Sequence, residues 1–287
     1  MSTPEIQWYP GHIAKAERAL ADQLNRVDVV LEVRDARIPL ATRYPSLDQW
    51  AGEKGRVLIL NRVDMIMPEA RARWEDWFKS EGVTPYFTNA QQGQGISAIT
   101  KAAQAAGEAV NQRRISRGMR PRPIRAVVIG FPNVGKSALI NRLLNRKAVA
   151  SARRAGVTRQ LQWVRVSGDL DLLDAPGVIP ARLDDQQAAL KLAICDDIGE
   201  AAYDTQRVAA AFIDLLKTLQ EQHQVAAYSQ ALKNRYGIET GPVTGESFVV
   251  LLAEKTFQQD AERAARRILD DFRTGNLGPL PLEWPTL

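Results

Sequence analysis

The chain has 287 residues, of which 45% are hydrophobic and 25% are charged, and its formal net charge is +5. This composition excludes fibrous and intrinsically disordered classes, and the length suits one large or two ordinary globular domains. The longest apolar runs fall far short of the roughly 20 residues of a membrane-spanning helix, and no signal-peptide pattern opens the sequence. We therefore expect a cytoplasmic protein with no membrane partner. The single cysteine, Cys195, excludes an internal disulfide and a cysteine-cluster metal site.

The first half of the chain alternates short β-rich runs with helical patterns. This alternation predicts an α/β domain with a mainly parallel sheet and flanking helices. Helices are expected over residues 68–79, 96–110 and 138–144. Strands are expected over residues 27–33, 56–60, 83–88, 126–130, 161–166 and 170–173.

Two changes of pattern divide the chain. Residues 111–125 contain six arginines, two prolines and one glycine, which predicts a basic, solvated linker inside the first domain. After about residue 190 the β pattern gives way to amphipathic helical spacing, with helices expected over residues 208–219, 225–236, 245–255 and 260–273. We therefore predict an α/β domain over residues 1–190 and a small all-α domain over residues 191–287.

A phosphate-binding loop follows the predicted strand at residues 126–130. The run Gly130-Phe-Pro-Asn-Val-Gly-Lys-Ser137 fits the pattern GxxxxGKS and precedes a helical pattern, which is the context that this loop needs. Glycines allow backbone N–H groups to surround phosphate oxygens, a lysine reaches the β and γ phosphates, and a serine hydroxyl ligates Mg²⁺. The residues that we assign to nucleotide binding here are Asn133, Val134, Gly135, Lys136, Ser137 and Ala138, with Ser137 also a Mg²⁺ ligand.

Two further segments supply the metal and γ-phosphate contacts of such a loop. Asp174-Ala-Pro-Gly177 ends an apolar strand 38 residues after Lys136, so Asp174 is placed in the outer shell of Mg²⁺ and Gly177 at the γ phosphate. Thr158, in a glycine-containing loop between them, is a candidate Mg²⁺ ligand. The alternatives are an ordinary turn for the first segment and a surface threonine for the second.

Guanine rather than adenine is indicated by motifs that come earlier in the chain. Asp64, in Asn61-Arg62-Val63-Asp64, can accept two hydrogen bonds from the N1–H and NH₂ groups of guanine, which adenine does not offer. Asn89-Ala90 ends the next predicted strand and can present a backbone N–H to the guanine O6. Each motif is weak alone, but together at successive strand ends they predict GTP and GDP as ligands.

These are the five motifs of translation-factor-type GTPases in permuted order. Together with Trp8-Tyr-Pro-Gly-His-Ile-Ala-Lys-Ala16 and Asp35-Ala-Arg-Ile-Pro-Leu40, the chain resembles the ribosome biogenesis GTPase A family from end to end. The resemblance implies a circularly permuted P-loop GTPase domain with a small all-α C-terminal domain that binds RNA. It also implies a monomeric assembly factor that hydrolyses GTP to GDP and phosphate, binds the large ribosomal subunit and its rRNA, and is released on hydrolysis. The sequence departs from the family pattern at Arg62, Asn89 and Ala155, where Lys, Ser and Pro are usual.

The catalytic group is not the glutamine that many GTPases place after the DxxG glycine, because Val178 occupies that position and cannot orient water. Hydrolysis is therefore expected to be slow alone and stimulated by the ribosomal subunit. The resemblance points to His12 as the residue that orients or deprotonates the attacking water; the alternative is a histidine that caps a helix or contacts RNA. Asn133, in related GTPases, helps to ligate a monovalent cation, which makes K⁺ a second candidate cofactor; the alternative is an asparagine that bonds its own loop.

Three functions remain open from the sequence. The first is a GTP-hydrolysing assembly factor, and the second is a GTP-gated RNA-binding module in which hydrolysis is incidental. The third, a metabolic P-loop ATPase or kinase, leaves Asp64 without a role. Between Ala109 and Gly168 there are 14 Lys and Arg and no Asp or Glu, so the basic charge is local and a polyanion-binding surface is expected beside the nucleotide.

Overall fold

The computed structural model describes residues 6, 24–45, 47–144, 162–174, 185–241 and 243–286, except for the side chains of Gln162 and Asp174. A six-stranded sheet forms the centre of the first part of the chain, in the order β3-β2-β1-β4-β6-β5. Only the pairing of β5 with β6 is antiparallel among the described strands. The mainly parallel sheet is thus confirmed, with strands at β1 (Val29–Asp35), β2 (Gly55–Asn61), β3 (Pro85–Thr88), β4 (Ile124–Ile129), β5 (Gln162–Ser167) and β6 (Leu170–Asp174).

The burial of β1 and β2 agrees with their position inside the sheet. All seven residues of the central strand β1 are buried, and the last five residues of β2 are buried as well. A strand that is covered on both faces is a nearly continuous apolar run, which is the pattern of VDVVLEV in the sequence. The helices of this part are α2 (Leu47–Ala51), the 3₁₀ helix η1 (Val63–Met65), α3 (Pro68–Ser80), α4 (Ile96–Ser116) and α5 (Lys136–Leu143).

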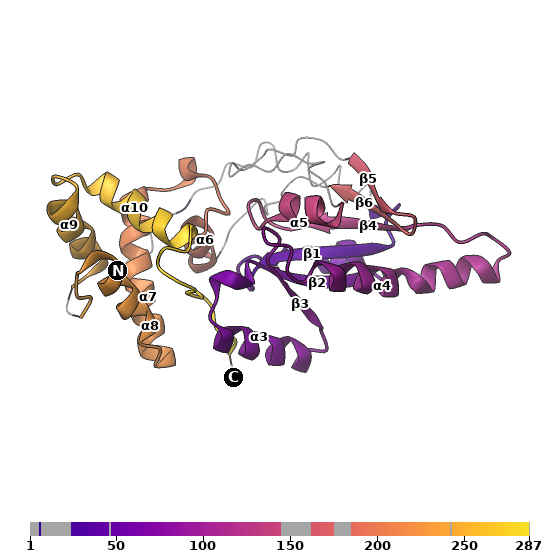
Figure 1. Cartoon of the computed structure of the whole chain (residues 1–287), viewed down its shortest axis with the longest axis horizontal. Coiled ribbons are helices and arrows are strands. Elements are labelled where there is room, and N and C mark those ends of the chain that lie inside the picture. Colours follow the sequence, from indigo (N-terminus) through magenta and orange to yellow (C-terminus); the bar gives the residue numbers. More distant parts are fainter. Residues whose placement is uncertain are drawn as a thin grey trace.

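Helix α4 packs along β1, β2 and β4 and also contacts α5 (Figure 1). Gly107 allows this close approach, because a Cβ atom there would lie 2.5 Å from the Cγ2 atom of Ile124 in β4. Gly55 plays the same part in β2, where a Cβ would lie 2.6 Å from the carbonyl oxygen of Ala106. The two glycines therefore allow the helix to lie close to the sheet, and the buried Ile99 and Ala103 of α4 pack into the core.

The prediction of a linker at residues 111–125 is wrong for much of its length. Helix α4 continues to Ser116, and β4 begins at Ile124. The run Gln112-Arg113-Arg114 is compatible with a helix, and Gly118, with φ of 72°, turns the chain back. A run of arginines predicts contact with solvent. The exposed side of a helix provides that contact as well as a linker does, because arginines there need no apolar contact. We call residues 111–123 the spur.

The second part of the chain is helical, as predicted. Its helices are α6 (Gln186–Ile194), the 3₁₀ helix η2 (Glu200–Ala202), α7 (Thr205–His223), α8 (Ala227–Tyr236), α9 (Gly245–Thr256) and α10 (Ala261–Arg273). The four helices expected beyond residue 205 are all present, whereas α6 was not foreseen. The predicted domain boundary at residue 190 falls inside α6, which packs against α7.

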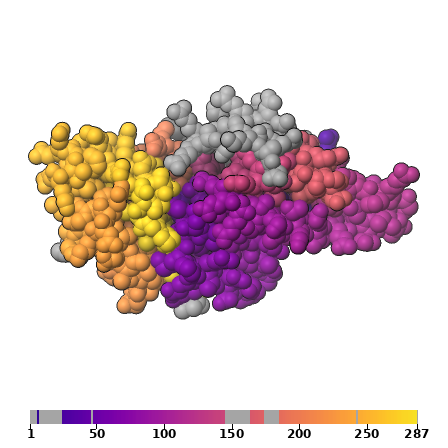
Figure 2. Space-filling view, in the orientation of Figure 1, coloured from indigo at the N-terminus to yellow at the C-terminus, as the bar shows by residue number. Residues whose placement is uncertain are grey.

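The C-terminal segment returns from the helical part to the sheet. The Leu282 N–H donates to the Arg37 carbonyl at 2.9 Å, and the Trp74 indole donates to the Glu283 carbonyl at 3.3 Å. The Glu283 carboxylate accepts from the N–H groups of Leu40 and Ala41. The two parts consequently form one continuous body (Figure 2). Among the described residues, no helix is both apolar enough and long enough to span a bilayer.

Candidate nucleotide-binding site

The predicted motifs meet at one edge of the sheet. Because β1, β2, β3, β4 and β6 are parallel, their carboxyl ends lie side by side, and this edge is where open α/β sheets bind ligands. The described motifs each follow one of these strands: the strands end at Asp35, Asn61, Thr88, Ile129 and Asp174. The described motifs therefore lie along the same edge of the sheet.

Asn61 joins three of these loops. Its Nδ2 donates to the carbonyl of Val134 at 2.8 Å, and its Oδ1 accepts from the Ala90 N–H at 3.0 Å and the Thr88 hydroxyl at 3.1 Å. Because Asn61 is buried, removal of its side chain would leave each of these groups without a hydrogen bond, and water could not replace it. Asn61 thus ties the guanine motif to the phosphate-binding loop.

The phosphate-binding loop has the backbone shape that anion binding requires. Gly135 has φ of 102°, and a Cβ atom there would lie 2.1 Å from Nδ2 of Asn61, so only glycine fits. Helix α5 begins directly after it, at Lys136, with its first N–H groups directed toward the loop. The Lys136 ammonium donates to the Phe131 carbonyl at 2.7 Å, which places it across the loop. The arrangement suits a bound phosphate chain.

The metal-binding residues are described only in part. Ser137 lies in the first turn of α5, and β6 brings Asp174 into register with Val128, two residues before Gly130. A hydroxyl and a carboxylate are oxygen ligands of the kind that Mg²⁺ prefers. The Asp174 side chain, Thr158, Gly177 and the catalytic candidate His12 lie outside the described residues, so their roles stay predictions.

Asp64 is accessible from solvent. It lies in η1, it is exposed, and its carboxylate has no hydrogen-bond partner among the residues that the structure describes. Its neighbour Arg62, with φ of 66°, donates to the Asn133 carbonyl at 2.7 Å and lies 3.4 Å from the Asp35 carboxylate. The arginine that replaces the usual lysine therefore supports the phosphate-binding loop.

The loop after β3 is fixed by its own hydrogen bonds. The Asn89 side chain accepts from the Gln92 N–H, and the Asn89 N–H donates to Gln94. Arg142 of α5 donates to the carbonyls of Ala90 and Gln91. Since the Ala90 N–H donates to Asn61 in this structure, its predicted contact with the guanine O6 stays a prediction.

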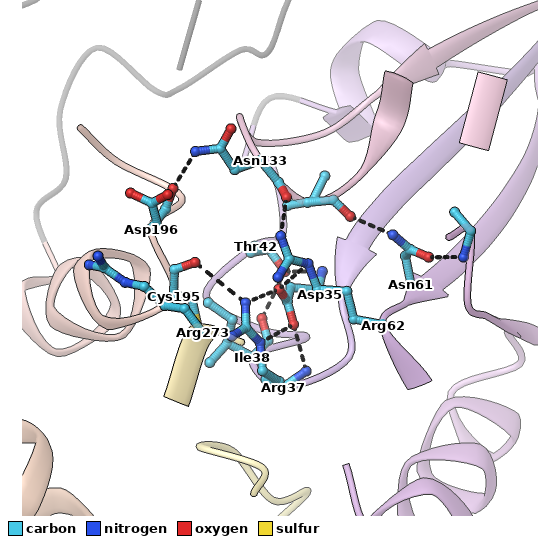
Figure 3. A network of polar contacts seen from close by, with 12 residues as sticks. Asp35, Arg37, Ile38, Thr42, Asn61, Arg62, Asn133, Cys195, Asp196 and Arg273 are labelled. Carbon is cyan, nitrogen blue, oxygen red and sulfur yellow. Dashed lines mark hydrogen bonds and ion pairs between the residues drawn. The ribbon is translucent and has the colours of Figure 1, made fainter. Parts of the chain in front are cut away.

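Asn133 connects the phosphate-binding loop to the helical part (Figure 3). Its φ is 58°, and its Nδ2 donates to the carbonyl of Asp196 at 2.5 Å. Asp196 follows α6 and also has a positive φ, of 66°. The Asn133 amide thus donates to a carbonyl of the helical part and not to the backbone of its own loop, which was the alternative.

An ion pair that the sequence analysis did not predict, within the run from Asp35 to Leu40, lies below this contact (Figure 3). Asp35, fully buried at the end of β1, accepts from the Arg37 N–H at 2.9 Å and from its guanidinium at 2.7 and 3.0 Å. Arg37 also donates to the Cys195 carbonyl at 3.4 Å and lies 5.1 Å from the centre of the Phe272 ring. The available signal was an acidic and a basic residue directly after an apolar strand, in Asp35-Ala-Arg37.

The pKa of Asp35 is shifted in the opposite direction to the pKa of its neighbour Asp197. Burial alone raises the pKa of Asp35, but the guanidinium groups of Arg37 and Arg62 outweigh it and hold that pKa below 3.8. Burial raises the pKa of Asp197 well above 3.8, and the negative charge of Asp35 adds to this effect. Both Asp197 oxygens and the Arg37 Nη1 are buried without a hydrogen-bond partner among the described residues. Asp197 therefore holds its proton more tightly than an exposed carboxyl group does.

Comparisons with known proteins find relatives over nearly the whole chain. A family described as 50S ribosome-binding GTPase matches residues 125–238. Ribosome biogenesis GTPase A of Bacillus cereus is 34% identical over 98% of this chain and 94% of its own length, and that of Bacillus pumilus is 34% identical over 98% and 99%. Mitochondrial ribosome-associated GTPase 1 of Bos taurus is 30% identical over 96% of this chain and 88% of its own.

Solved structures share the fold. GNP-bound YlqF from T. maritima superposes with a TM-score of 0.63 at 24% identity, covering 94% of this chain and 98% of that one. The GDP-bound form gives 0.62 at 24% identity, covering 93% and 99%. The predicted α/β fold, a circularly permuted P-loop GTPase domain followed by a small all-α region, is thereby confirmed.

Replacement of Asn61 by alanine is expected to weaken GTP binding by at least about tenfold. The change removes three hydrogen bonds that hold the two binding loops together, each worth about 1 kcal/mol. Titration with a fluorescent GTP analogue measures the effect. Thr88→Val removes only one of the three bonds and serves as the control, so equal affinities of the two variants would contradict the bridging role.

Asp197→Asn is expected to stabilise the protein more at pH 7.5 than at pH 4.5. The folded protein keeps the proton on Asp197 where the unfolded chain has lost it, so wild-type stability falls as pH rises above 3.8 toward the raised pKa. Each unit of that elevation corresponds to about 1.4 kcal/mol. Asp35 has the opposite sign, but its contribution is lost only as pH falls below 3.8.

Urea unfolding at the two pH values measures this difference. The control is Asp76→Asn, which changes an exposed carboxylate of α3 and is expected to have the same small effect at both values. A stability difference between Asp197→Asn and wild type that does not grow with pH would show that Asp197 is ionised in the folded protein.

Proposed function

We propose, since this chain belongs to the ribosome biogenesis GTPase A family, that this GTP-hydrolysing assembly factor acts on the large ribosomal subunit, binds its rRNA and leaves on hydrolysis. The observation that carries the nucleotide half is the Asn61 bridge between the guanine motif and the phosphate-binding loop. The large-subunit half is supported by the description of the matching family as 50S ribosome-binding. The protein is proposed to work as a monomer in the cytoplasm.

The residues divide the work of holding GTP. Asp64 accepts hydrogen bonds from the guanine N1–H and NH₂ groups, and the loop amides from Asn133 to Ala138 surround the phosphates. Lys136 offsets the negative charge of the β and γ phosphates. Ser137, Thr158 and Asp174 would hold Mg²⁺, which offsets phosphate charge when bound. Gly177 offers its N–H to the γ phosphate and so distinguishes GTP from GDP.

Hydrolysis depends on a group other than the residue that follows the DxxG glycine. Val178 has no polar atom to orient water, so GTP turnover by the protein alone is slow. His12 supplies the missing function when the protein is bound to the ribosomal subunit, and its neutral imidazole orients or deprotonates the attacking water. Hydrolysis is in this way restricted to protein that is bound to its target.

A second candidate function is a GTP-gated RNA-binding module in which hydrolysis is incidental. The hydrogen bond from Asn133 to Asp196 favours it, because a residue of the phosphate-binding loop reaches directly into the helical part. Binding of GTP at that loop is then communicated to the RNA-binding region without turnover.

GTP turnover is expected to rise at least tenfold when purified large subunits are added, and His12→Ala is expected to remove most of this gain. A positioned acid or base contributes about 10²- to 10⁴-fold, and the affinity for GTP stays the same because His12 is not one of the base or phosphate contacts. The assay is phosphate release during a subunit titration. His223→Ala, which changes the other histidine, is the control. Unstimulated wild-type turnover would favour the GTP-gated module instead.

K⁺ is proposed as a second cofactor, held in part by Asn133. Its Nδ2 is used by Asp196, whereas its Oδ1 has no partner among the described residues and is a suitable cation ligand. Turnover is expected to be about tenfold faster in KCl than in NaCl at equal ionic strength, and Asn133→Ala is expected to remove the difference. Equal wild-type rates in the two salts would refute this role.

A further inference from the structure

The spur is the most strongly charged projection that the structure describes. It extends beyond the sheet at the end opposite the helical part (Figures 1 and 2). Its free positive charges are those of Arg113, Arg114, Arg117 and Arg120. None of these four guanidinium groups pairs with a carboxylate within the described ranges, so their charge is directed to solvent.

The spur is held in one shape by its own hydrogen bonds. The Asn111 side chain donates to the Arg122 carbonyl at 3.0 Å and accepts from its N–H at 3.1 Å. The Arg114 Nε donates to the Arg120 carbonyl at 3.1 Å across the turn. At the base, the Arg122 guanidinium makes two bonds of 2.7 and 2.9 Å to the buried Asp28. A preorganised basic arm loses little conformational entropy on binding.

The spur lies far from the nucleotide. Helix α4 begins next to the guanine loop at Ile96 and ends in the spur, and its 21 residues span roughly 30 Å. The sequence predicted one polyanion-binding surface beside the nucleotide from the 14 basic residues between Ala109 and Gly168. The structure separates that charge, because β4 runs from the spur at one edge of the sheet to the phosphate-binding loop at the other.

The arginines of the helical part are different. On α10, Arg266 pairs with Glu262 at 2.9 Å and Arg267 with Asp271 at 3.0 Å. Arg273 is almost buried and donates to the carbonyls of Ala193 and Ile194. This helix therefore uses much of its charge for folding, whereas the spur does not.

We propose that the spur is a separate RNA-binding surface that grips the phosphates of a structured RNA whether or not GTP is bound. All five basic residues of the spur are arginines, whose planar guanidinium groups bind phosphate through two hydrogen bonds and stack on bases. Ile115 and Met119, 51% and 41% exposed at the tip, supply apolar contact for an unstacked base. An anionic membrane would require a broad apolar face, which two side chains do not form.

This inference rests on the proposed function only for the source of the RNA, which is the large ribosomal subunit. The test is fluorescence-anisotropy binding of the full chain to a labelled RNA hairpin of about 20 base pairs, over a series of KCl concentrations, with GDP and with a non-hydrolysable GTP analogue. The variant R113Q/R117Q/R120Q leaves Arg114 and Asn111, which hold the turn. It is expected to bind about tenfold more weakly and to lower the slope of log affinity against log salt by about 2, equally with both nucleotides.

The matched control is K79Q/K101Q/K233Q, which removes three exposed lysines, one of them at the other end of α4. It is expected to keep nearly the wild-type salt slope. R113K/R117K/R120K keeps the charge and is expected to keep the slope while it loses stacking. Unchanged basal GTP turnover in R113Q/R117Q/R120Q confirms that the variant is folded.

Three results would overturn the proposal. They are a salt slope that does not change in R113Q/R117Q/R120Q, an equal loss in the lysine control, and a loss of binding to anionic phosphatidylserine vesicles without any loss of binding to RNA. The proposed function is tested separately, by the stimulation of GTP turnover with the large subunit. Stimulation together with normal RNA binding by the spur variant overturns only the spur proposal. Absence of stimulation together with weakened RNA binding by the spur variant overturns only the proposed function.

Discussion

The buried ion pair between Asp35 and Arg37 fixes how the sheet, the phosphate-binding loop and the helical part meet. Asp35 ends the central strand and also faces Arg62, which supports the carbonyl of Asn133. Arg37 reaches the helical part through Cys195 and Phe272, and its carbonyl receives the C-terminal segment at Leu282. Two charges removed from water are costly unless their bonds are nearly all made, so this pair tolerates only one arrangement of its neighbours.

The same group of residues gives the molecule two kinds of connection between nucleotide and helices. The connection through Asp35 and Arg37 is rigid, since both side chains are fully buried and ionised. The connection through Asn133 and Asp196 is a single hydrogen bond between half-buried residues of two loops. A conformational response to the nucleotide would therefore break the Asn133 contact first, with the ion pair as the pivot.

The sequence predicted the features that depend on local pattern. Strand ends carried the motifs, and the spacing of Val208, Phe212 and Leu216 predicted the buried face of α7. It missed what depends on tertiary structure. The hydrogen bond from Asn133 to Asp196 joins segments 63 residues apart, and the shape of the spur depends on the hydrogen bonds between Asn111 of α4 and the backbone of Arg122. Asp197 carries no sequence signal at all, because an acidic residue is buried only where the surrounding fold encloses it.

The order of the strands has a consequence for biosynthesis. Strand β1 pairs with β2 on one side and with β4 on the other, and β4 is made only after β2, β3 and the whole of α4. A nascent chain thus completes its base-recognition half while one edge of its fully buried strand β1 is still unpaired. Such an edge is a template for wrong pairing until β4 arrives, and the phosphate-binding loop follows β4 directly. The central strand therefore gains its second neighbour, and the phosphate-binding loop is made, at the same stage of translation, before β5 and β6 extend the sheet.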